Sequence, residues 1–166
     1  LKEKEITISW RDRFAYHYSS PMPGEVAADP EVEDAPRPKP VLIDIETGEE
    51  VWKTESKNFV STKPEEFRGS WSTPFVYGSG ADAVMFISMP LKFYALKPRT
   101  GDILWTCDGP GMLAYTSPLV NRDIAVTMSG YGGPSLAIKR GGQGDVTASH
   151  RLWHKTERVE NPQRIG

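Results

Sequence analysis

Two histidines four residues apart are the first residues in this chain whose spacing suggests chemistry. On a helix, the spacing of His150 and His154 would suit a metal ion. The segment that contains them has the pattern of a strand around Trp153, and residues i and i+4 of a strand lie about 13 Å apart. The third histidine, His17, is distant in the sequence. We therefore predict surface or edge roles for the histidines and no metal site.

The other reactive residue types lack the neighbours that catalysis requires. Cys107 is the only cysteine, which excludes an internal disulfide and a CxxC metal site. The glycine-rich segment 141–144 has no following Lys-Ser/Thr, so we interpret it as a turn and not as a phosphate loop. Three serines, Ser70, Ser72 and Ser117, have no paired His and Asp signature. The sequence thus offers no catalytic or cofactor-binding residue.

Charge and hydropathy narrow the possible partners. The formal net charge of −2 does not suit a nucleic-acid polycation. No apolar run approaches the 18 residues of a membrane-spanning helix, so we expect no membrane insertion. The 15 glycines and 14 prolines among 166 residues exceed average usage and are typical of a turn-rich, all-β chain.

A repeated hairpin is the element around which the chain is organised. Residues 93–105 form an alternating apolar run, a tight turn at Thr100-Gly101 and a second run that ends in Trp105. Residues 41–52 repeat this pattern, and in both copies three residues separate Thr-Gly from Trp. A hairpin that recurs in this form indicates a repeat protein.

A similar spacing between a proline and the following tryptophan shows that the repeat is longer than the hairpin. Pro21 to Trp52 and Pro74 to Trp105 each span 31 positions, and Pro118 to Trp153 spans 35 because a longer turn at 140–145 replaces Thr-Gly. The proline-to-proline periods are 53 and 44 residues, a range typical of β-propeller blades.

The predicted fold is therefore all-β, a partial β-propeller of about three four-stranded antiparallel blades. The whole chain, 1–166, is one segment with repeats at about 11–53, 70–107 and 114–154. Residues 1–10 would end a preceding blade and 155–166 would begin a following one. We expect the first blade to be degenerate, because the prolines within 22–40 remove donors from any strand ladder. The predicted strands of the complete repeats are 73–77, 83–88, 92–96, 102–107, 117–120, 124–129, 135–139 and 149–154.

The hairpin motif resembles the repeats of PQQ-like (quinoprotein-type, BamB-like) β-propellers, a bacterial family. The family pattern is roughly A-L-D-x-x-T-G-x-x-x-W, and residues 95–105 are similar to it, as are residues 44–52. In that family the terminal tryptophan docks between blades against the turn glycine of another repeat. The resemblance therefore implies structural docking roles for Trp52, Gly48, Trp105, Gly101 and Trp153.

The resemblance implies a non-catalytic scaffold that binds a protein or another macromolecule in the periplasm or another extracytoplasmic compartment. Its partner would be a protein or the remaining blades of the propeller. Two alternatives stay open: part of a PQQ-dependent alcohol or sugar dehydrogenase, and a sugar- or polymer-sensing domain. We expect no cofactor in this segment, with PQQ and calcium as the minor alternative, because the chain lacks the adjacent cysteines of many quinoprotein dehydrogenases.

Aromatic and arginine residues outside the core alternation are the candidates for a binding rim, since Tyr, Trp and Arg dominate interface hot spots. Packing in the seams between blades is the competing interpretation. The rim residues are Arg68, Trp71, Tyr115, Arg122 and Tyr131.

Overall fold

The structure is a computed structural model that describes residues 14–17, 41–44, 46–53, 69–130 and 132–156. Strands dominate these residues, as the alternating sequence pattern predicts. The predicted strand at 6–10, the proline-rich segment 22–40 and the polar connection 54–68 lie outside the described residues.

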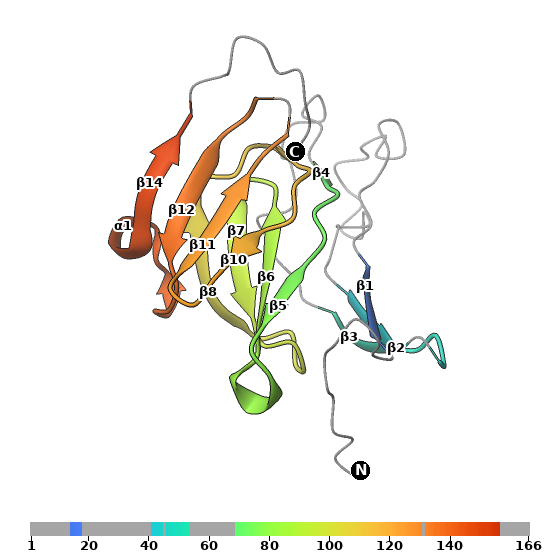
Figure 1. The fold of residues 1–166 in the computed structure, drawn as a ribbon. Helices are drawn as coiled ribbons and strands as arrows, with labels where there is room; N and C mark the ends of the chain where they lie inside the picture. The colour runs from blue at the N-terminus through green and yellow to red at the C-terminus, as the bar shows by residue number, and fades with distance from the viewer. Residues whose placement is uncertain (1–13, 18–40, 45, 54–68, 131, 157–166) are drawn as a thin grey trace, which may run out of the picture.

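Three sheets lie side by side in Figure 1, in the order of the three sequence repeats. The first sheet contains β1 (Phe14–His17), β2 (Val41–Asp44) and β3 (Glu50–Lys53), in that order. The central sheet has the order β13-β8-β7-β6-β5, and the last sheet has the order β10-β11-β12-β14. Within these three sheets, neighbouring strands are antiparallel apart from the β13–β8 pair of the central sheet.

The strands of the second repeat are β5 (Phe75–Tyr77), β6 (Val84–Met89), β7 (Lys92–Leu96) and β8 (Ile103–Asp108). The third repeat supplies β10 (Leu119–Val120), β11 (Ile124–Met128), β12 (Ser135–Lys139) and β14 (Arg151–Lys155). All eight predicted strands are present; β7 and β12 have the predicted bounds, and the bounds of the other six differ by one or two residues. A short parallel pair, β4 (Gly69–Ser70) with β9 (Leu113–Ala114), was not predicted.

Each repeat ends in the same backbone register. Trp52 lies opposite Leu42, Trp105 opposite Ala95 and Trp153 opposite Ala137. In all three pairs the register shifts directly after this position, so that one extra residue bulges from the outer strand. The predicted tight turns are also equivalent, since Gly48 N donates to Asp44 O and Gly101 N donates to Lys97 O. Both glycines have positive φ, +72° and +73°, which explains the glycine of the motif.

The third repeat departs from the prediction at its long turn. Residues 144–145 form β13, which leaves the last sheet and pairs in parallel with β8 of the central sheet. The expected strand at 149–154 begins two residues later, at Arg151, because α1 (Thr147–His150) precedes it. The central sheet is consequently five-stranded where four strands were predicted. We call residues 140–150 the crossing segment.

Two apolar clusters fill the spaces between the sheets. Phe86, Phe93 and Trp105 of the central sheet pack with Leu136 and Ile138 of the last sheet. On the opposite face of the central sheet, Met85, Ile87, Met89, Tyr94 and Leu96 pack with Trp52 of the first sheet. The central sheet is therefore covered on both faces, and this stacking determines which surfaces remain for partners.

Candidate binding surfaces

The three predicted docking tryptophans have three different environments. Trp52 is half-buried, and its indole N–H donates to the carbonyl of Pro98, 2.9 Å away in the tight turn of the central sheet. Trp105 is buried among Phe86 and Phe93, with ring centroids 5.9 and 6.0 Å away. Trp153, at the corresponding position of the last sheet, is 43% exposed. The same sequence position thus packs against a neighbouring sheet in two repeats and borders solvent in the third.

Trp153 is part of a larger apolar face of the last sheet. Leu119, Val126, Ala137 and Trp153 lie in register across all four strands of the last sheet. The residues on the opposite side of these strands, among them Ala125 and Leu136, pack on the central sheet. Leu119 is 71% exposed and the bulge residue Leu152 is 52% exposed. We call this surface the Trp153 face.

The corresponding row of the central sheet shows what such a face contacts when it is covered. Phe75, Phe86, Ala95 and Trp105 lie in register in the same way. Phe86, Ala95 and Trp105 are at most 3% exposed, because the last sheet packs against them. The Trp153 face therefore has the composition of an inter-sheet contact without the sheet that would cover it among the described residues.

The predicted binding rim is divided in the structure. Trp71 and Tyr115 stack with ring centroids 4.7 Å apart and an interplanar angle of 6°. Trp71 is 47% exposed. Arg122 lies in the β10–β11 turn, before the first residue of β11. Tyr115 lies near the other end of β11, because its neighbour Thr116 donates to the carbonyl of Met128. Arg68 and Tyr131 lie outside the described residues. The structure thus brings together two of the five rim residues.

Buried hydroxyl groups hold the aromatic pair in place. Ser70 Oγ donates to the carbonyl of Ser88 at 2.6 Å, and Thr116 Oγ1 donates to the carbonyl of Met128 at 2.6 Å. The Ser88 hydroxyl in turn bonds the Thr127 hydroxyl across the central and last sheets. These hydroxyls therefore bond to the main chain and across the two sheets.

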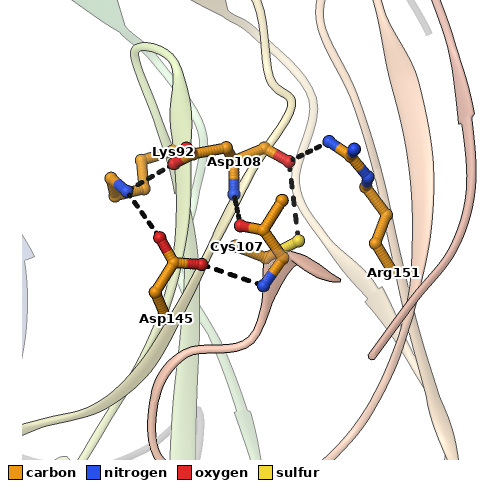
Figure 2. A network of polar contacts seen from close by, with 6 residues as sticks. Lys92, Cys107, Asp108, Asp145 and Arg151 are labelled. Carbon is orange, nitrogen blue, oxygen red and sulfur yellow. Dashed lines mark hydrogen bonds and ion pairs between the residues drawn. The ribbon is translucent and has the colours of Figure 1, made fainter. Parts of the chain in front are cut away.

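A charged network fixes the crossing segment to the central sheet (Figure 2). The ammonium of Lys92 on β7 forms ion pairs with Asp108 on β8 and, at 3.7 Å, with Asp145 on β13. Thr147 links the same strands, since its hydroxyl accepts from Asp108 N and its own N–H donates to Asp145, both at 2.9 Å. Arg151 donates to the carbonyl of Asp108 at 3.1 Å. The Lys92–Asp108–Asp145 network therefore joins two repeats.

The titration of this network follows from its contacts. Hydrogen bonds from the side chain and backbone of Thr147 and the charge of Lys92 hold the pKa of Asp145 below its usual value. Burial lowers the pKa of Lys92, but the hydrogen bond and charge of Asp108 and the charge of Asp145 outweigh it, so the pKa is raised. Burial raises the pKa of the Cys107 thiol, which favours the unreactive neutral form.

We expect Asp145→Asn to remove part of the acid sensitivity of folding. The folded carboxylate has the lower pKa, so its stabilising contribution is present above about pH 3.9 and is lost as the pH falls through the folded value. Urea unfolding should show the wild type more stable than the variant at neutral pH, by about 0.5 kcal/mol or less because the pair is exposed. The difference should vanish at strongly acidic pH and shrink in roughly 1 M salt. A difference that is constant with pH would contradict this assignment.

The histidines have separate partners. His150 Nδ1 lies 2.7 Å from Ser149 Oγ, and His154 Nε2 lies 3.0 Å from the carbonyl of Gly109. In the part of the chain that the structure describes, no group of three His, Cys, Asp or Glu side chains is arranged to hold a metal ion. The PQQ-and-calcium alternative remains a prediction that these residues do not test.

Neither the scan against protein-family models nor the search of curated proteins returns a match to this chain. Within the described residues, no helix has the length and apolar character needed to cross a membrane.

Proposed function

We propose that the chain is a non-catalytic β-propeller segment that serves as a scaffold for binding protein through the Trp153 face. The single observation that carries this proposal is the exposure of Leu119 and Trp153, the two ends of the row Leu119, Val126, Ala137 and Trp153, whose counterpart in the central sheet is buried by another sheet. The occupant is a β-sheet with an apolar face, contributed by a further blade or by a partner protein. The extracytoplasmic location implied by the family resemblance belongs to the same proposal.

The repeated geometry supports this choice of occupant. The first sheet places Trp52 on the central sheet, and the central sheet places Trp105 on the last sheet. The common register and bulge mean that the last sheet presents its tryptophan in the same direction. Leu119 and Trp153 are the exposed apolar ends of this row, and exposed apolar patches mark interaction sites on soluble proteins. A sheet that packs as the last sheet packs on the central one would cover Trp153 and Leu119.

Leu119→Asp is expected to weaken association without unfolding the chain. Leu119 is 71% exposed, so the free energy of unfolding should change by no more than about 0.5 kcal/mol. Binding of an apolar fluorescent dye and concentration-dependent self-association, measured by sedimentation, should both decrease. Val51→Asp is the matched control, because Val51 is 43% exposed on β3 of the first sheet. Equal decreases in both variants would contradict a specific role for the Trp153 face.

The function itself is tested in the full-length protein in cells. A photo-reactive amino acid at position 119 should cross-link to a segment of β-sheet, which mass spectrometry locates in the same chain or in a partner. The control position is Asp82 in the short helix η2 (Gly80–Asp82), which is exposed and lies outside the Trp153 face. Cross-linking at position 119 that does not exceed the control would overturn the proposal. Dye-linked oxidation of an alcohol or sugar by the protein with PQQ and Ca²⁺ would favour the dehydrogenase alternative instead.

A further inference from the structure

A cavity of about 510 Å³ lies between the central sheet and the crossing segment. Phe86, Ile103 and Trp105 of the central sheet form part of its wall, and Arg140 with residues 141–144 forms another part. This volume is within the range of small-molecule sites. The cavity is distinct from the Trp153 face, because Phe86 and Trp105 belong to the cluster between the central and last sheets.

The cavity has a physical origin in the difference between two equivalent tryptophans. Between the first and central sheets, the indole N–H of Trp52 donates to the carbonyl of Pro98 in a tight turn. In the third repeat the corresponding turn is replaced by the crossing segment, whose residues 144–145 pair with β8 instead. Trp52 therefore has a backbone carbonyl as its partner, whereas Trp105 lines the cavity.

The indole N–H of Trp105 is consequently an unused donor. Trp105 is 3% exposed, yet its N–H makes no hydrogen bond to any part of the chain that the structure describes. The nitrogen is not one of the fully buried side-chain atoms that lack a partner, so it is reachable by solvent and can donate to an acceptor from outside the chain. A ligand that accepts a hydrogen bond in the cavity supplies the partner that Pro98 supplies to Trp52.

The charge on the wall of the cavity indicates the nature of that acceptor. Among the described residues that line it, Arg140 is the only charged one. Its Nη1 donates to the carbonyls of Asn121 and Arg122, at 2.7 and 2.8 Å, and its guanidinium carbon lies 4.0 Å from the centre of the Tyr77 ring. Its buried Nε has no hydrogen-bond partner, and no carboxylate of the described residues pairs with the guanidinium. As far as the described residues define it, the cavity therefore combines an apolar wall with a positive charge that no carboxylate of those residues pairs.

We propose that this cavity binds a small organic carboxylate. The carboxylate accepts from the Trp105 indole and pairs with the Arg140 guanidinium, and the apolar part of the ligand packs against Phe86 and Ile103. Charge-assisted hydrogen bonds of this type are stronger than those to a neutral acceptor, so a neutral amide of the same shape binds less tightly.

The experiment uses 3-phenylpropionate as the probe and 3-phenylpropionamide as its neutral counterpart. In ¹H–¹⁵N NMR spectra, the indole resonance of Trp105, assigned by its loss in Trp105→Phe, should shift saturably with 3-phenylpropionate. The resonance of Trp153 should not move. The amide should bind about tenfold more weakly, as should the carboxylate to Arg140→Gln. No saturable shift, or equal affinity for the acid and the amide, would overturn the proposal.

A cavity-filling variant separates binding from folding. Ile103 lines the cavity and is 42% exposed, so Ile103→Trp should block the site from its accessible side while leaving the core intact. Met112→Trp is the matched control, because Met112 is 44% exposed and does not line the cavity. The Ile103 variant should lose at least about tenfold in affinity and the Met112 variant should bind as the wild type does. Unchanged binding to Ile103→Trp would place the probe elsewhere and overturn the proposal.

Discussion

Trp105→Ala is expected to lower the free energy of unfolding by about 3 to 5 kcal/mol, the range for removing a buried aromatic side chain. Trp105 is 3% exposed and contacts Phe86 and Phe93 within the cluster that joins the central and last sheets. Its loss opens a cavity between the two sheets, and the close-packed side chains around it can move only partly into that space. Urea unfolding, monitored by circular dichroism because a tryptophan is lost, measures the change.

Trp153→Ala is the internal control, since Trp153 occupies the same register position in the last sheet. It is 43% exposed, so its removal should cost about 1 kcal/mol or less. In an assembly where a further sheet covers the Trp153 face, this cost should rise toward that of Trp105. Equal costs in the isolated chain would contradict the burial difference, and a Trp105 cost under about 1 kcal/mol would exclude a docking role.

Local patterns in the sequence predicted the strands because the hairpins are formed by residues close in the chain. The bounds of β7 and β12 were predicted correctly, since alternating apolar residues and glycine turns specify them locally. The turn at Asn121 between β10 and β11 was also predicted. In this turn the side-chain oxygen of Asn121 accepts hydrogen bonds from Asp123 N and Ile124 N. The all-β class is therefore confirmed, and the closure of such sheets into a propeller remains a proposal.

Contacts between distant segments could not be predicted in the same way. Pairing of Gly144 with Trp105 removes residues 144–145 from the turn of the third repeat, and no local pattern indicates it. The stacking of Trp71 on Tyr115 depends on the parallel β4–β9 pair, whose strands are two residues long. The ion pair of Lys92 and Asp108 could have been predicted from the sequence, because extending the register of the 93–105 hairpin places these residues opposite each other. The cavity had none, because it arises from the path of the crossing segment.

Val146→Asp is expected to have the largest effect of any single change in the crossing segment. Val146 is 2% exposed, belongs to the cluster between the central and last sheets, and donates its N–H to the carbonyl of Thr106 at 2.9 Å. An aspartate there would bury a charge among apolar side chains, or would detach the segment from β8 to reach water. Either outcome should cost more than about 4 kcal/mol, a large part of the 5 to 15 kcal/mol that stabilises a typical domain.

The expected loss of stability in Val146→Asp depends on the burial of position 146 and not on the new charge alone. A second position in the crossing segment serves as the control. Ala148 is exposed in α1, two residues from Val146, so Ala148→Asp should change the free energy of unfolding by about 0.5 kcal/mol or less. Val146→Ala, which should still fold, should cost about 1 to 3 kcal/mol through lost apolar contact. Native-state hydrogen exchange of the β13 and α1 amides would distinguish detachment from global unfolding. Similar stabilities for Val146→Asp and Ala148→Asp would mean that Val146 does not anchor the crossing segment to the core.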